Sequence, residues 1–112
     1  MKERRKERIE KLILETLGEL IQQNIPQLLS KFVTVSRVIL SNDGRSAKIY
    51  ITSFEDPDYC VEILNHNAGY LRKLLAEKLN LRYTPSLKFL KDEEAEKIRR
   101  IEELLERMKN EG

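Results

Sequence analysis

The chain has 112 residues, of which 40% are hydrophobic and 36% are charged, and its formal net charge at pH 7 is +2. This length fits one domain around one hydrophobic core and leaves little room for a second domain. The single cysteine excludes an intramolecular disulfide and favours a reducing compartment, and no stretch approaches the roughly 18 apolar residues of a membrane span.

An amphipathic helix is predicted over residues 3–23. Apolar residues recur there at three- and four-residue spacing from Ile9 to Ile21, and charged residues occupy the other face. Asn24 and then Pro26 mark its end. The basic segment before Ile9 leads into no uninterrupted apolar core, so it is not a secretory signal and we expect a cytoplasmic protein.

Two strands are predicted next, at residues 32–40 and 46–54, because both segments are rich in β-branched and alternating apolar residues. Between them lies the sequence Asn42-Asp43-Gly44-Arg45. The Asp-Gly pair supplies the positive φ angles that a tight turn needs. We therefore predict a β-hairpin.

A further helix is predicted to begin at Pro57, with Asp56 as its N-cap. Its apolar register continues for more than twenty residues, but Gly69 lies in the middle of it. Glycine inside a helix costs roughly 1 kcal/mol relative to alanine, which indicates a kink or a close backbone approach at that point. We therefore predict two helices, at about 57–67 and 69–79.

The third strand is predicted at residues 81–90, with an edge position or an interruption at Pro85 because proline cannot donate to a ladder. Asp92 is predicted to cap a last helix, at about 93–109. An apolar stripe runs along that helix through Ile98, Ile101, Leu104, Leu105 and Met108. We expect the stripe to pack against the sheet; the alternative is that it docks a partner helix.

These elements predict one α+β domain over residues 1–112, in which helices pack on one face of a three-stranded sheet. The residues that could carry catalysis are few. His66, the only histidine, is expected at an exposed helix end, with a stacking or phosphate contact as the alternative. Cys60 is expected to be a small buried hydrophobe, and one histidine with one cysteine cannot complete a zinc tetrahedron.

The acidic residues Glu55, Asp56 and Asp58 suit the start of a helix better than a divalent-cation site. With so few convergent groups, we expect no enzymatic activity, no metal and no cofactor.

Positive charge is concentrated in residues 68–91, which carry six basic side chains and one acidic side chain. The segments 12–67 and 92–112 each carry a net negative charge. A concentrated basic segment indicates a polyanion-binding surface, and a solvated helix face is the equally weighted alternative on charge alone.

The predicted kink adds to this evidence. Backbone N–H groups left free at the start of the second helix can bind a phosphate, and Gly69 lets a nucleic-acid backbone approach without a Cβ in the way. Arg72 and Lys73 follow in the first turn, where cations oppose the helix dipole, and Tyr70 offers a ring for stacking. The alternative is that Gly69 packs tightly against a neighbouring strand.

The chain resembles the family of bacterial ribosome-binding factor A over essentially its whole length. The resemblance rests on Val33-Thr34-Val35 with Val38, on residues 46–51 (SAKIYI), on residues 68–72 (AGYLR) and on residues 81–89 (LRYTPSLKF). The last run is the most specific of the four. Residues 101–105 (IEELL) are similar to the closing helix of the family.

The resemblance implies a type II KH-like domain in which an Ala-x-Gly kink replaces the usual Gly-x-x-Gly loop. Here the triplet is Asn67-Ala68-Gly69, with asparagine where alanine is typical. We expect a monomer with no membrane partner. The resemblance implies a protein that binds free small ribosomal subunits and their rRNA late in assembly. It also implies help in processing the rRNA 5′ end without nuclease activity. The predicted RNA-binding residues are Asn67, Ala68, Gly69, Tyr70, Arg72, Lys73, Lys78, Arg82 and Lys88.

Overall fold

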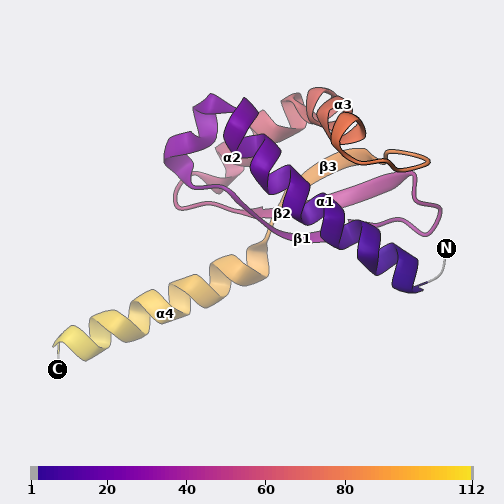
Figure 1. Ribbon diagram of the computed structural model, residues 1–112. Helices are drawn as coiled ribbons and strands as arrows, with labels where there is room; N and C mark the ends of the chain where they lie inside the picture. The colour runs from indigo at the N-terminus through magenta and orange to yellow at the C-terminus, as the bar shows by residue number, and fades with distance from the viewer. Residues whose placement is uncertain (1–2, 112) are drawn as a thin grey trace.

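A computed structural model describes residues 3–111 (Figure 1). In chain order its elements are α1 (Glu3–Asn24), the 3-10 helix η1 (Pro26–Lys31), β1 (Thr34–Leu40), β2 (Ser46–Thr52), α2 (Pro57–His66), α3 (Ala68–Lys78), β3 (Ser86–Lys91) and α4 (Glu93–Glu111). The predicted order of helices and strands is confirmed, with η1 as an addition that the sequence did not predict.

The three strands form one sheet in the order β1-β2-β3. The β1–β2 pair is antiparallel, as the hairpin prediction requires, and β2 pairs in parallel with β3. Of the two turn residues only Gly44 takes a positive φ, at 73°, while the Asp43 carboxylate accepts a 3.0 Å hydrogen bond from the Arg45 N–H. The turn is therefore closed by a side chain as well as by glycine.

Helices α1, α2 and α3 cover one face of the sheet (Figure 1). Alternate strand residues face these helices and are buried, among them Ile49 and Ile51 of β2 and Phe89 of β3. The opposite face is exposed at Lys48 and Lys88, which lie beside each other across β2 and β3. The predicted three-stranded α+β fold with helices on one face is thus confirmed for α1 to α3.

The third strand is shorter than predicted. Residues 81–85 form a loop, because the Arg72 guanidinium donates to the Thr84 carbonyl from Nε at 3.1 Å and from Nη2 at 2.9 Å. Pro85 then removes a donor from the same segment. The first strand also begins later, because Phe32 ends η1 with a φ of 52°.

The acidic residues around the start of α2 make ion pairs with lysines and no side-chain capping bond. Asp56 has a φ of 51° and makes no capping hydrogen bond with its side chain. Its carboxylate and that of Glu55 each lie 3.0 Å from the Lys31 ammonium, and these two hydrogen bonds raise the pKa of Lys31. Asp58 pairs with Lys91 at 3.2 Å. Asp56 is therefore the N-cap residue of α2, as predicted, but its carboxylate binds Lys31 of η1 instead of the first N–H groups of the helix.

Helix α4 does not pack against the sheet, contrary to the expectation from its apolar stripe. It projects away from the body of the molecule (Figure 1). With α4 included, the molecule measures 57 × 32 × 18 Å along its principal axes. Exposed fractions along the stripe rise from 53% at Ile98 to 67% at Met108. Among residues 3–111, no helix is long and apolar enough to cross a membrane.

The start of α4 is nevertheless fixed to the sheet. The Asp92 carboxylate accepts a 3.0 Å hydrogen bond from the Ala95 N–H, as predicted for an N-cap, and a second at 2.7 Å from the hydroxyl of Ser36, at the irregularity of β1. Both bonds stabilise the ionised form and lower the pKa of Asp92. About two turns after Asp92, Arg99 donates to the carbonyls of Ser53 and Phe54.

Candidate nucleic-acid interface

The predicted kink is a single residue, Asn67, between two helices. Its N–H donates to the carbonyls of Ile63 and Leu64 at 3.1 Å, and its side-chain amide donates to Ile63 at 2.8 Å. The Asn67 side chain thus completes the end of α2 and makes no capping bond to the first turn of α3. Asparagine at this position therefore does not occupy the N–H groups with which α3 begins.

Gly69 lies in the first turn of α3, and the surface beside it is open. A Cβ built on it would meet no atom within 4 Å, and its φ is not positive. Neither packing nor backbone conformation therefore requires glycine here, so the alternative of a glycine packed against a strand is wrong. The position is open to an approaching ligand backbone.

A hollow of about 390 Å³ opens beside Gly69, between α3 and the α3–β3 loop. We call it the kink groove; its lining residues are Gly69, Arg72, Lys73, Ala76, Leu81, Arg82, Tyr83 and Thr84. Lys73 stands one helical turn after Gly69, so both lie on the same face of α3. Lys73 and Arg82 line the groove with ammonium and guanidinium groups and add positive charge to it.

Arg72 lines the kink groove and also makes contacts within the protein. Its guanidinium holds the Thr84 carbonyl, lies 3.3 Å from the Tyr83 hydroxyl and sits 5.6 Å from the centre of the Tyr83 ring. A guanidinium held by these contacts shapes the α3–β3 loop. Arg72 therefore positions the wall of the kink groove.

The other predicted residues are dispersed. The Tyr70 hydroxyl lies 3.5 Å from the Asn24 side-chain oxygen and does not line the groove. Lys78 is in the last turn of α3, where a cation favours the helix dipole. Lys88 is on the uncovered face of the sheet, and His66 is exposed at the end of α2. The structure therefore brings together Gly69, Lys73 and Arg82, but it separates Lys88 from them.

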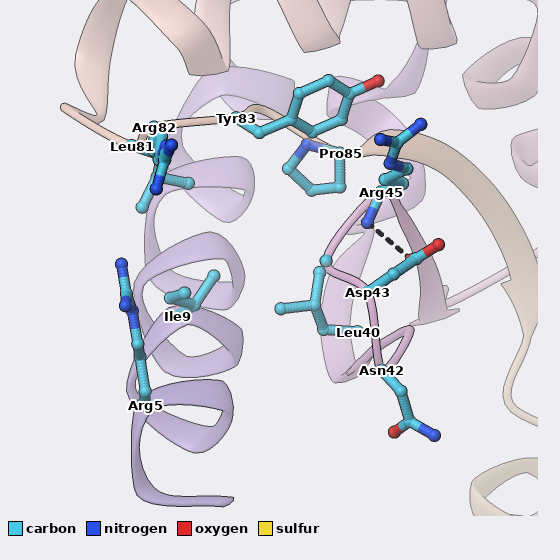
Figure 2. Close-up of a pocket in the computed structure, with 11 residues that line it drawn as sticks. Arg5, Ile9, Leu40, Asn42, Asp43, Arg45, Leu81, Arg82, Tyr83 and Pro85 are labelled. Atoms are coloured by element: carbon cyan, nitrogen blue, oxygen red, sulfur yellow. Dashed lines mark hydrogen bonds between the residues drawn. The ribbon is translucent and has the colours of Figure 1, made fainter. Parts of the chain in front are cut away.

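Sequence reasoning missed a second basic hollow, of about 770 Å³, on the other side of the α3–β3 loop (Figure 2). Its rim carries Arg5 from α1, Arg45 from the hairpin and Arg82 from the loop. We call it the arginine pocket. The only sequence signal for it was the basic start of the chain, since three distant segments form it.

Cys60 is fully buried in the core, as predicted for a small hydrophobe. Burial raises the pKa of its thiol, so the nucleophilic thiolate is disfavoured. Among residues 3–111 no group of three or more His, Cys, Asp or Glu side chains could hold a metal ion.

Comparison with known proteins gives independent evidence of the family to which the chain belongs. Residues 5–105 match the sequence profile of a family described as "Ribosome-binding factor A". The ribosome-binding factor A of Pseudothermotoga lettingae is 40% identical over 106 residues, which cover 92% of this chain and 87% of the relative. That of Halothermothrix orenii is 32% identical over 114 residues, which cover 99% and 93%.

Solved structures agree with the sequence matches. The crystal structure of ribosome-binding factor A from Thermus thermophilus superposes with a TM-score of 0.70 at 30% identity, and covers 77% of this chain and 94% of that one. A Thermus thermophilus homology model fitted into the cryo-EM map of a 30S–RbfA complex gives 0.64 at 29% identity, with coverage of 74% and 90%. The KH-like fold is thereby confirmed, and the chain belongs to the ribosome-binding factor A family.

Proposed function

We propose that this protein binds the small ribosomal subunit through its rRNA, with the kink groove as a principal contact. The observation that carries the proposal is Gly69, a glycine that neither packing nor φ requires and that opens onto a groove lined by Lys73 and Arg82. A relative fitted into a map of a 30S complex supports the choice of polyanion.

In this proposal an rRNA phosphate lies at the start of α3, where the first N–H groups carry a partial positive charge. Gly69 lets the sugar–phosphate backbone come close, while Lys73 and Arg82 neutralise neighbouring phosphates. Arg72 holds the α3–β3 loop in place through its hydrogen bonds to Thr84, and its positive charge also adds to the attraction of the groove for phosphate. Contacts of this kind recognise the shape of RNA more than its sequence.

The proposal also includes where and when the protein acts in the cell. The protein acts in the cytoplasm on free small subunits late in their maturation and assists processing of the rRNA 5′ end without cleaving RNA itself. Purified protein incubated alone with precursor rRNA should leave the 5′ end uncut. Cleavage by the protein alone would replace this proposal with that of a hydrolase.

The test introduces two carboxylates into the kink groove alone, as Lys73→Glu with Ala76→Glu. Both positions line this groove but not the arginine pocket. Co-sedimentation with purified small subunits should fall at least about tenfold, because two phosphate-facing sites become repulsive. Arg72 is left intact, since its loss would also disturb the loop.

The matched control is Lys97→Glu with Arg100→Gln, which changes the net charge by the same amount on exposed positions of α4. Co-sedimentation of the control should match the parent chain, and thermal melting should show that both variants fold. Undiminished binding by the groove variant would exclude the kink groove as the rRNA contact.

A second candidate function is favoured by α4. Its exposed stripe from Ile98 to Met108 buries no residue against the rest of the described chain, so the helix can dock a protein partner through this face. This function is compatible with RNA binding, because α4 projects away from the kink groove (Figure 1).

A further inference from the structure

The arginine pocket is lined by apolar and aromatic side chains as well as by arginines, so it can contact other parts of a ligand besides a phosphate. Three segments frame it: α1 on one side, the hairpin on the other, and the α3–β3 loop across the top (Figure 2). Its volume, about 770 Å³, is in the range of pockets that enclose small organic ligands. A contact with phosphate alone needs no such hollow.

The interior of the pocket is apolar. Leu40 and Pro85 are buried, and Ile9 and Leu81 are half-buried beneath the opening. Tyr83 stands at the edge, 52% exposed, with the Arg45 guanidinium carbon 5.9 Å from its ring centre. Aromatic rings and guanidinium planes are the groups on which proteins stack unpaired bases, and here both stand beside apolar surface.

The rim is polar and carries both signs of charge. Arg5, Arg45 and Arg82 are exposed and can each meet a phosphate in bidentate fashion. Asp43 of the hairpin also lines the hollow, and hydrogen bonds from the Ser41 hydroxyl and the Arg45 N–H lower the pKa of its carboxylate. It therefore remains an ionised acceptor, which suits a base N–H or a ribose hydroxyl and would repel a purely anionic ligand.

The walls are held together without a ligand. The Glu10 carboxylate accepts a 2.8 Å hydrogen bond from the Leu40 N–H, which joins α1 to the end of β1. The Arg45 carbonyl accepts a 2.9 Å hydrogen bond from the Ser86 N–H, which joins the hairpin to β3. A site whose walls are already fixed loses little conformational entropy on binding.

We propose that the arginine pocket binds one unpaired nucleotide of RNA, with the base on the apolar floor and the phosphates at the three guanidinium groups. The inference rests on the RNA-binding function proposed above and adds a second, base-accepting contact to it. Residues 81–83 line both hollows, so one RNA strand can pass from the kink groove over the α3–β3 loop into the pocket.

The test uses the full chain, labelled with ¹⁵N, and a short unstructured oligoribonucleotide. Amide signals of Arg45 and Tyr83 should shift on titration. An abasic oligomer with the same number of phosphates should not shift them and should bind at least about fivefold more weakly, because base stacking is lost. If the abasic oligomer binds equally well, the pocket takes phosphate only and the proposal fails.

Variants locate the contact. Arg5→Gln with Arg45→Gln should weaken oligonucleotide binding at least about fivefold. Arg100→Gln with Arg107→Gln removes the same charge from exposed positions of α4 and should leave the affinity unchanged. Equal affinities for the two double variants would overturn the proposal, as would competition by an acidic peptide as strong as that by the oligonucleotide.

The outcome also separates this inference from the function on which it rests. Signal shifts confined to Gly69 and Lys73, with subunit binding intact, would overturn the nucleotide pocket and leave the proposed function standing. Loss of subunit binding in the groove variant, together with loss of oligonucleotide binding in the pocket variant, is the result that supports both.

Discussion

At the scale of single residues, two glycines lie in helices without a structural need. Gly18 of α1 and Gly69 of α3 both have open space where a Cβ would stand. Each should cost roughly 0.5–1 kcal/mol of stability relative to alanine. A glycine that destabilises its helix is expected where a ligand must come close to the backbone. Of these two glycines, only Gly69 lies beside a groove lined by charged residues.

Gly69→Ala should therefore raise the free energy of unfolding by roughly 0.5–1 kcal/mol and weaken small-subunit binding, because the methyl group enters the path of the RNA backbone. Gly18→Ala is the control, since it should raise stability similarly without changing binding. Urea unfolding and co-sedimentation measure the two effects. Unchanged binding by Gly69→Ala would show that the backbone of the ligand does not approach this residue.

Gly69 and Lys73 could be chosen as candidate site residues from local chemistry alone, because a helix glycine and a cation in a first turn are both visible in the sequence. Arg72 was predicted to bind the ligand for the same reason, and the sequence did not show that its guanidinium also donates to a carbonyl twelve residues away. Local sequence does not show which cation a later loop will engage. Arg5 and Arg45 were missed because only the fold brings them to Arg82.

At the scale of elements, apolar periodicity predicted where helices lie but not what each one contacts. The stripes of α1 and α4 have the same spacing, yet α1 lies in the core while α4 buries no residue. The alternation of apolar and polar residues led to a similar error at residues 81–85. Leu81 and Tyr83 are spaced by two residues in step with Leu87, which predicted a strand, but this segment is a loop. Tertiary contacts decide both cases.

Removal of residues 93–112 should leave the domain folded. Helix α4 contributes no buried residue, and the Asp92 N–H bond to the Ile51 carbonyl is retained in the shortened chain. The melting temperature should therefore fall by no more than about 5 °C, measured by circular dichroism. Loss of the cooperative transition would mean that α4 stabilises the sheet, and its stripe would then be structural.

At the scale of the whole molecule, net charge gives little guidance to binding. The formal charge is only +2, but Arg5, Arg45, Lys73 and Arg82 gather around one loop, at the end of the molecule away from α4 (Figure 1). Positive potential concentrated at one end attracts a polyanion even when the total charge is small.

The affinity for an rRNA fragment should therefore depend steeply on salt. If these side chains make about four phosphate contacts, the logarithm of the association constant should fall with the logarithm of salt concentration at a slope of roughly −3. Lys73→Gln should reduce the magnitude of that slope by about 0.7–0.9. Fluorescence anisotropy at several salt concentrations gives both values, and a slope near zero would exclude binding through phosphates.

The projection of α4 gives the molecule two ends that can be occupied at the same time. A protein docked on the stripe and an RNA held at the opposite end would be joined across at most the 57 Å length of one chain. Where the protein partner and the RNA belong to one particle, such a link sets an effective local concentration on the order of millimolar, and two individually weak contacts can then hold the chain on that particle. Release of one end would remove this gain and leave only the weak contact at the other end, from which the protein would dissociate quickly.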